Sequence, residues 1–173
     1  AAREIRAARG PARAIVANNV LAHVDDPRDF LSGCKALISQ DGRVVIEVPY
    51  LQELLDRLEY DTIYHEHLSY FSVNALTRLC DAVGLSIVGI EPVEVHGGSL
   101  RLHLGATEHY GPHATAVEAL AARESHAGLT SRTRYERFAA DVARSRQALV
   151  GLLEEVNAAG GTVAGYGAPA KGN

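Results

Sequence analysis

One short segment, EYDTIYHEHLSYFS at residues 59–72, brings together three tyrosines, two histidines and three carboxylates. Tyr64, His65, Glu66 and His67 follow one another directly within it. A histidine titrates near neutral pH, a neighbouring carboxylate can orient it and raise its basicity, and a phenol can donate a hydrogen bond to a developing oxyanion. Together these groups could remove a proton from a carbon that is bonded to a carbonyl group.

Two other interpretations of this cluster stay open. His65 and His67 form an HxH pair that could bind zinc, but the sequence offers no third ligand in a recognisable place and no HExxH motif, so we predict no metal site. The cluster could also consist of polar residues in an ordinary surface loop. The density of titratable groups favours a site for proton transfer.

The segment EVHGGSLR offers a second set of polar groups that could contact a substrate. We predict His96, Gly98, Ser99 and Arg101 as substrate-binding residues, and Ser99 and Arg101 are of the types that hold phosphate. The pair Gly97 and Gly98 equally suits a plain hairpin turn, which needs no further function.

A third candidate is the segment GYGAPAKGN at the end of the sequence. The spacing of Gly165, Gly167 and Ala170 fits a dinucleotide fingerprint, in which glycines let backbone N–H groups approach a diphosphate. The Walker pattern is not met, because its spacing differs and Asn173 stands in place of a serine or threonine. Phosphate contact and a plain tight turn both stay open, and we count Lys171 among the candidate substrate contacts.

The elements that must position these groups alternate between helix and strand. Apolar residues at three- and four-residue spacing predict helices, and β-branched runs predict strands. Asp25 or Asp26 and Ser72 are the expected N-caps of two helices, with Gly42 and Gly84 beyond their ends. The expected helices cover residues 2–9, 25–41, 51–58, 73–83 and 131–158, and the expected strands lie around Ile15 and Val16, at 43–50, 85–95 and 99–105, and from 162 onward.

This order predicts an α/β fold with a parallel sheet, helices on both faces and an antiparallel hairpin at the edge, as in the second half of an open doubly wound sheet. In such sheets the ligand lies beyond the carboxyl ends of the strands. Asn18, Asn19 and His23 follow the first strand, and the segment 59–72 follows the second by one helix. We therefore expect both groups to face the same crevice.

The composition excludes several classes of protein. The 173 residues are 47% hydrophobic, which suffices for a packed core, and the net charge of -4 disfavours nucleic acid or an anionic membrane as partner. No stretch reaches the length of a membrane-spanning helix, and the N-terminal residues lack a signal-peptide core, so we expect a cytoplasmic protein. Cys34 and Cys80 lie in amphipathic patterns and are expected to be buried free thiols.

Three features predict that the sequence is an internal piece of a longer protein. It contains no methionine, and it begins within an expected helix. It also stops within a glycine-rich turn.

The segments ANNVLAHVDDPRDFL, EVPY, YDTIYHEHLSYFS, EVHGGSLR and GYGAPAKGN, in this order, resemble the S-adenosylmethionine-dependent sugar C-methyltransferases that act on nucleotide-linked 4-keto-deoxyhexoses. The resemblance covers nearly the whole chain, and YHEHLSYFS is its most specific part. It implies an enzyme of deoxysugar biosynthesis with a nucleotide-sugar substrate and leaves the oligomeric state open.

The resemblance also implies a three-part protein: an N-terminal zinc module, a central class I (Rossmann-like) methyltransferase domain and a C-terminal Rossmann-like domain. Residues 1–108 would be the second half of the central domain, and 109–173 a helical connection with the start of the last domain. The zinc module and most of the cofactor site would then lie outside this chain. We accordingly expect no independent activity from it.

By the same resemblance, His67 is the base that deprotonates the sugar carbon, Tyr64 and Glu66 surround the keto group, and His23 completes the catalytic set. The S-adenosylmethionine contacts would come from Ala17, Asn18, Asn19 and Leu21, partly through backbone atoms. Two alternatives stay open. One is a nucleotide-sugar epimerase that uses the same base, and the other is a non-catalytic nucleotide-binding module whose long helix, 131–158, meets a partner.

Overall fold

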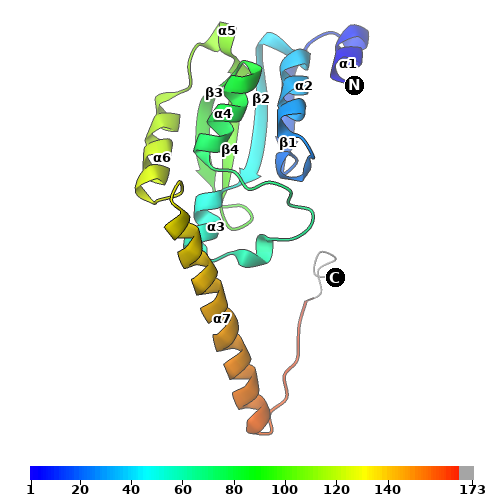
Figure 1. The fold of residues 1–173 in the computed structure, drawn as a ribbon. Coiled ribbons are helices and arrows are strands. Elements are labelled where there is room, and N and C mark those ends of the chain that lie inside the picture. Colours follow the sequence, from blue (N-terminus) through cyan, green and yellow to red (C-terminus); the bar gives the residue numbers. More distant parts are fainter. Residues whose placement is uncertain (168–173) are drawn as a thin grey trace. The chain divides into compact units, whose positions relative to one another are not determined.

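The computed structural model describes residues 1–167 of the chain, which divides into two compact units (Figure 1). The first unit is Ala1–Thr130, and the second begins at Ser131. Ala170 and Lys171, predicted to contact phosphate and substrate, lie outside the described residues.

A mixed four-stranded sheet forms the centre of the first unit. Its strands are β1 (Ala12–Asn18), β2 (Ile38–Pro49), β3 (Leu85–Val93) and β4 (Ser99–Ala106), in the order β1-β2-β4-β3. β1 is parallel to β2, whereas β4 runs antiparallel to both β2 and β3. The predicted α/β fold with a terminal antiparallel hairpin is therefore confirmed, and the hairpin inserts β4 between the two strands that precede it in the sequence.

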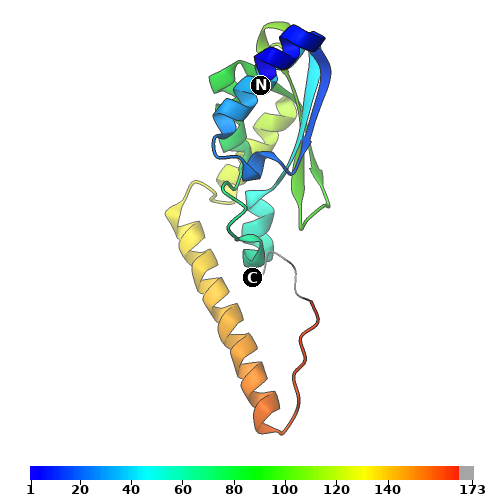
Figure 2. The ribbon, with the colours of Figure 1, turned by 90° about the vertical axis from the view of Figure 1, so that its right-hand side faces the viewer.

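The helices of the first unit lie on one face of this sheet, and the prediction of helices on both faces is wrong for the residues described (Figure 2). α2 (Pro27–Leu37) connects β1 to β2, and α4 (Val73–Val83) lies between β2 and β3. Both connections join parallel strands and move across the sheet in the same direction. Because such crossovers are right-handed, two steps in one direction place both helices on the same face.

Two helix N-termini form where the sequence predicts them. The side chain of Asp26 accepts hydrogen bonds from the backbone of Arg28 and Asp29 at the start of α2, and that of Ser72 accepts one from Ala75 at the start of α4. Gly84 ends α4 with a left-handed φ of 72°.

The expected end of α2 is wrong. α2 stops at Leu37, and the next residue already belongs to β2, which runs through Gly42. Ile38 pairs with Ala12 of β1, so pairing with the edge strand extends the chain before the expected stop signal is reached.

The hydrophobic core fills the space between the sheet and these helices. Alternate residues of the central strands point into it, because successive side chains of a strand face opposite sides of the sheet. The residues that are at most 1% exposed there include Val44, Ile46, Val48, Leu100, Leu102 and Leu104.

The first unit continues past residue 108, where the sequence placed a domain boundary. α5 (Thr107–Tyr110) follows β4, and α6 (Thr115–His126) packs against α4 and β3. Val117 and Leu120 of α6 are buried in the core. The compact unit therefore ends at Thr130.

The second unit contains α7 (Arg132–Ala158), which confirms the long helix predicted at 131–158. Its apolar stripe includes Leu149 and Leu152, which are 55% and 56% exposed. Residues 161–167 form no strand, so the strand expected from residue 162 is absent from the part that the structure describes. A Rossmann-like domain that starts here stays a prediction.

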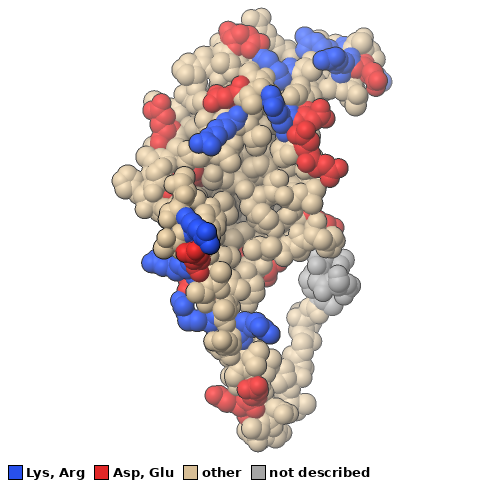
Figure 3. Space-filling model, viewed as in Figure 1, with Lys and Arg blue, Asp and Glu red and all other residues tan. Residues whose placement is uncertain are grey.

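Two surface properties bear on partners. On the face shown in Figure 3, acidic and basic side chains are interspersed. Among the helices of residues 1–167, none combines the length and apolar character that a membrane crossing needs.

Both cysteines are buried free thiols, as predicted. Burial raises the pKa of Cys34 to about 11 and, together with the nearby Asp81 carboxylate, that of Cys80 to about 12.

The thiolate is the reactive form, and at about pH 8 a thiol of ordinary pKa is partly ionised. We therefore expect neither cysteine to react with a thiol reagent in the native complete protein at that pH, and both to react after denaturation. Peptide mass spectrometry locates the labels, and fast native labelling of either cysteine would contradict the burial described here.

Candidate active site

The candidate site lies where the chain leaves the carboxyl ends of β1 and β2. η1 (Leu21–His23) follows β1, whereas α3 (Leu51–Arg57) and η2 (Tyr60–Thr62) follow β2. The backbone N–H groups of Leu68 and Ser69 both donate to the carbonyl of Ala22, at 2.9 and 3.2 Å. These bonds join the segment 59–72 to the loop after β1, as the topology predicts.

His67 is the centre of a hydrogen-bonded group within this segment. Its Nδ1 lies 2.9 Å from the carbonyl oxygen of Thr62, and its Nε2 lies 2.9 Å from the hydroxyl of Tyr64. A carbonyl oxygen can only accept, so Nδ1 must carry the hydrogen and donate it to Thr62. In the neutral ring the lone pair is then on Nε2, where it accepts from the Tyr64 hydroxyl. This is the form of histidine that a general base requires.

His23 lies beside His67 and is held in the same manner. Its Nδ1 lies 2.8 Å from the backbone carbonyl oxygen of Glu66, so it also carries the hydrogen. The ring centroids of His23 and His67 are 4.9 Å apart, and those of Tyr64 and His67 are 4.3 Å apart. The structure thus brings three of the four predicted catalytic side chains together.

The role of Glu66 differs in part from the expectation that a neighbouring carboxylate orients the histidine. The partner of His67 Nδ1 is the carbonyl of Thr62, and Glu66 orients His23 through its backbone carbonyl. The Glu66 residue is exposed. A contact of its carboxylate with a keto group stays a prediction.

Sequence reasoning missed Thr62 and Tyr70. The Tyr70 hydroxyl donates to the Thr62 carbonyl at 3.4 Å, and its ring meets that of His67 edge to face with centroids 6.0 Å apart. Burial raises the pKa of Tyr70, so it acts here as a neutral hydrogen-bond donor. Tyr70 lies in the same tyrosine-rich segment and could have been found there, whereas no sequence signal marks a backbone carbonyl.

Among residues 1–167, three non-glycine residues have a positive φ, and each lies at a junction next to this region: Asn19, Leu58 and His96. Asn19 starts the loop after β1 and Leu58 ends α3, while His96 lies at the tip of the β3–β4 hairpin. Non-glycine residues in this conformation are uncommon and cluster at functional sites.

The hairpin tip packs against the helix that leads into the candidate site. Arg57 of α3 donates to the carbonyl of Gly97 at 2.9 Å. The carboxylate of Glu59 lies against Gly97, whose φ of 82° is a conformation that favours glycine. Gly98 lies against Glu53 of α3, so the turn that contains the predicted substrate-binding residues His96 and Gly98 is beside this helix.

Arg101 and Ser99 occupy less open positions. Arg101 pairs with Glu47 at 3.0 Å and with Glu91 at 3.6 Å, and the Ser99 hydroxyl donates to the backbone carbonyl of Val95. A phosphate would have to compete with two carboxylates for the Arg101 guanidinium. Phosphate binding by these two residues stays a prediction.

The predicted cofactor residues form the end of β1 and the turn after it. Ala17 is buried and Asn18 is exposed, whereas Leu21 is fully buried and presents no surface to a ligand in this structure. The side-chain oxygen of Asn19 is buried, and within the described part of the chain it accepts no hydrogen bond. An orphaned acceptor is costly in a protein interior. It fits a hydroxyl or amine donor of a bound cofactor.

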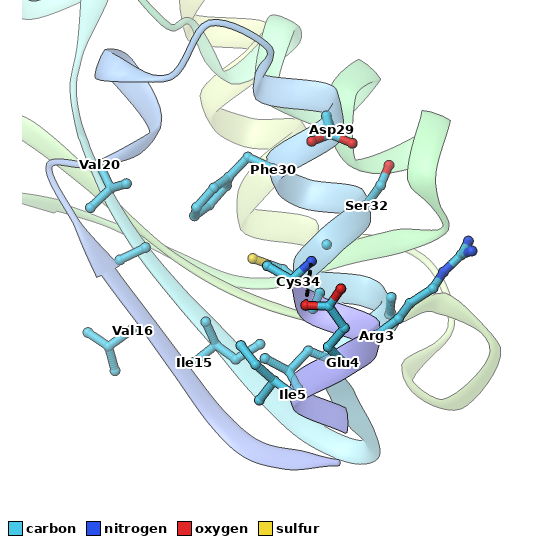
Figure 4. Close-up of a pocket in the computed structure, with 16 residues that line it drawn as sticks. Arg3, Glu4, Ile5, Ile15, Val16, Val20, Asp29, Phe30, Ser32 and Cys34 are labelled. Atoms are coloured by element: carbon cyan, nitrogen blue, oxygen red, sulfur yellow. Dashed lines mark ion pairs between the residues drawn. The ribbon is translucent and has the colours of Figure 1, made fainter. Parts of the chain in front are cut away.

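An apolar groove of about 740 Å³ lies next to this turn, between α1 (Ala2–Arg9), β1 and α2 (Figure 4). Ile15, Val20 and Phe30 line it together with Ala17. His67 and Tyr64 do not line the groove. The candidate catalytic site is therefore the hydrogen-bonded group around His67 and His23, and the groove is a neighbouring surface.

Comparisons with known proteins agree with this architecture. Residues 1–90, more than half of the chain, match the family model described as methyltransferase domain, and residues 94–173 match the C-methyltransferase C-terminal domain. The chain is 39% identical over 170 residues to the C-methyltransferase NovU of Streptomyces niveus. That match covers 98% of this chain but 40% of the relative, so the chain spans well under half of the length of that protein.

Two solved structures show weaker likeness. The magnesium protoporphyrin IX methyltransferase ChlM of Synechocystis PCC 6803 is 12% identical with a TM-score of 0.42, covering 54% of this chain and 44% of that one. An O-methyltransferase family protein of Burkholderia thailandensis is 13% identical with a TM-score of 0.44, covering 61% and 33%. Both scores are below 0.5, so the family assignment depends on the sequence matches.

The two matched segments assign the chain to the methyltransferase class of proteins. Within that class, the chain belongs to the C-methyltransferase family.

The hydrogen bonds predict the tautomers of three histidines. We expect His67 and His23 to be Nδ1–H tautomers when neutral, because each Nδ1 faces a carbonyl oxygen. His113 is a matched control with the opposite pattern, since its Nδ1 accepts from the Ile87 N–H and its Nε2 faces the Asp81 carboxylate. Ring ¹⁵N chemical shifts of the complete protein at about pH 8 distinguish the forms. An Nε2–H form at His67 would contradict the geometry that makes it a base.

Proposed function

We propose that the complete protein is an S-adenosylmethionine-dependent C-methyltransferase that methylates a nucleotide-linked 4-keto-deoxyhexose at a carbon next to the ketone. The observation that carries this proposal is the Nδ1–H bond from His67 to Thr62, which leaves Nε2 as the basic nitrogen beside a tyrosine hydroxyl. The similarity to a C-methyltransferase supports the reaction class, because replacement of a hydrogen on carbon by a methyl group requires a base that takes up the proton.

His67 is the proposed base. Its Nε2 takes the proton from the carbon beside the ketone, and the electrons of that C–H bond move toward the ketone oxygen to form an enolate. Tyr64 is proposed to donate a hydrogen bond to that oxygen. Its hydroxyl bonds Nε2 in the structure, so we infer that it turns from His67 to the ketone when the substrate carbon occupies the space in front of Nε2.

His23 and Glu66 complete the proposed set. Their mutual hydrogen bond ties η1 to the segment of His67, and the ring of His23 covers one side of His67. The carboxylate of Glu66 is proposed to contact the substrate near its keto group.

The bound S-adenosylmethionine would supply a methyl group activated by positively charged sulfur. The methyl–sulfur bond would break as the new carbon–carbon bond forms, and the cofactor would leave as a neutral sulfide. Ala17, Asn18, Asn19 and Leu21 are proposed to contact this cofactor, and the orphaned acceptor of Asn19 is the side-chain atom that best fits one of its donors. The hairpin tip at His96 and Gly98, with Ser99, Arg101 and Lys171, is proposed to contact the nucleotide sugar.

An epimerase that uses the same base is the second candidate function. Deprotonation by His67 would be common to both reactions, and only the fate of the enolate differs.

The experiment is to incubate the complete protein in D₂O with S-adenosylmethionine and a small panel of thymidine diphosphate 4-keto-deoxyhexoses. We expect a product heavier by one methyl group, measured by mass spectrometry.

The other outcomes of that incubation are equally informative. Deuterium in the sugar without a methyl group would favour the epimerase. Binding of the nucleotide sugar with neither change would favour a non-catalytic module.

Replacement of the base is the sharpest mutational prediction. His67→Asn should lower turnover by about 10²- to 10⁴-fold, whereas substrate affinity stays within about threefold, because a general base acts mainly in the transition state. His65→Asn is the matched control, since His65 is exposed in the same segment and should leave turnover near the wild-type value. Single-turnover kinetics measure the first effect, and equilibrium binding measures the second. Unchanged turnover in His67→Asn would place the base elsewhere.

A further inference from the structure

The first turn of α4 is capped by a side chain from α6. A helix begins with backbone N–H groups that have no partner within the helix. Ser72 accepts from the third of these groups, at Ala75. The first two, at Val73 and Asn74, donate instead to the carboxylate of Glu124, and the Asn74 side chain donates to it as well, at 2.8 Å.

Glu124 is fully buried, with a relative exposure of 0%. A buried carboxylate is destabilising unless hydrogen bonds and local charge compensate for its lost hydration. Here three N–H donors and the positive end of the helix dipole supply that compensation. Burial and the nearby Glu124 carboxylate also raise the pKa of Tyr50, so the Tyr50 hydroxyl stays neutral next to Glu124.

The capped turn directly follows the candidate catalytic segment. Phe71, two residues before Val73, is buried, and its carbonyl accepts from Leu51 at 3.0 Å. Tyr70 donates to the Thr62 carbonyl, which is the same oxygen that fixes the Nδ1–H of His67. A short path of contacts therefore leads from the cap to the base.

We propose that Glu124 is a positioning residue for the base: by holding the first turn of α4 from α6, it fixes the end of the segment 59–72 and hence the orientation of His67. The expected effect on turnover rests on the proposed function, whereas the expected effect on the orientation of His67 does not. Glu124 belongs to the segment that matches the C-methyltransferase C-terminal domain, whereas His67 belongs to the segment that matches the methyltransferase domain. The second segment thus contributes to the site of the first.

The test uses the complete protein and the variant Glu124→Gln. Its amide can accept from Val73, but its NH₂ group then faces the donors of Asn74. We expect His67 to lose its uniform Nδ1–H tautomer in ¹⁵N spectra and turnover to fall by about 10²-fold at nearly unchanged affinity for the nucleotide sugar. The double variant Glu124→Gln with Asn74→Asp lets the glutamine donate to the new carboxylate, and we expect it to recover part of both signals.

Cys80→Ala is the matched control for lost stability. Cys80 is buried near the other end of α4, so its replacement leaves a cavity without touching the cap. We expect a wild-type tautomer and wild-type turnover. If Glu124→Gln does not fold, Asn74→Ala takes its place, because it removes one donor to Glu124, the side-chain amide of Asn74. Its effect is measured by the same His67 spectra and turnover.

The two readouts separate the possible failures. A wild-type His67 spectrum in a folded Glu124→Gln protein would overturn the positioning role, and so would equal changes in Glu124→Gln and Cys80→Ala. Absence of methyl transfer by the wild type would instead contradict the proposed function, while the spectra would still decide the role of Glu124.

Discussion

The parallel pairing of β1 and β2 is the constraint on which the candidate site depends. Asn18 lies opposite Glu47, so the two strands reach the same edge of the sheet within a few residues of each other. Each strand is followed there by irregular backbone, and the N–H group of Asn19 donates to the carbonyl of Glu47 across the junction. η1 and the segment 59–72 are therefore brought together by the sheet before any catalytic side chain makes a contact.

Backbone carbonyls then set the state of the histidines. Irregular segments contain carbonyl oxygens that take part in no β-sheet hydrogen bonds. The carbonyl of Thr62 faces Nδ1 of His67, and that of Glu66 faces Nδ1 of His23. Because a carbonyl cannot donate, it selects one tautomer whatever side chain its residue carries. His113 shows the reverse, since a backbone N–H faces its Nδ1. The same ring thus acquires opposite hydrogen-bonding properties from its backbone neighbours.

The two ends of the candidate segment are held by parts of the chain that come after it. At its start, Glu59 meets the hairpin tip at Gly97, and beyond its end Val73 donates to Glu124 of α6. Both contacts come from residues within the C-methyltransferase match. Because α6 packs on α4 and β3, these contacts lie within one compact unit. The two family matches meet between residues 90 and 94, inside that unit, so their boundary is not a boundary between structural domains.

The sequence by itself determined most of the helices and strands up to residue 106, the caps at Asp26 and Ser72, the hairpin, and the choice of His23, Tyr64 and His67 as candidates. These features depend on local patterns of apolar residues and on side-chain types that lie close together in the chain. Only the tertiary structure decided that the helices share one face, that α2 gives way to β2 at Ile38, that the Thr62 carbonyl faces His67, and that Glu124 caps the first turn of α4. The physical reason is that these properties come from crossover direction, strand pairing and backbone hydrogen bonds between distant segments, which leave no signal in residue type or spacing.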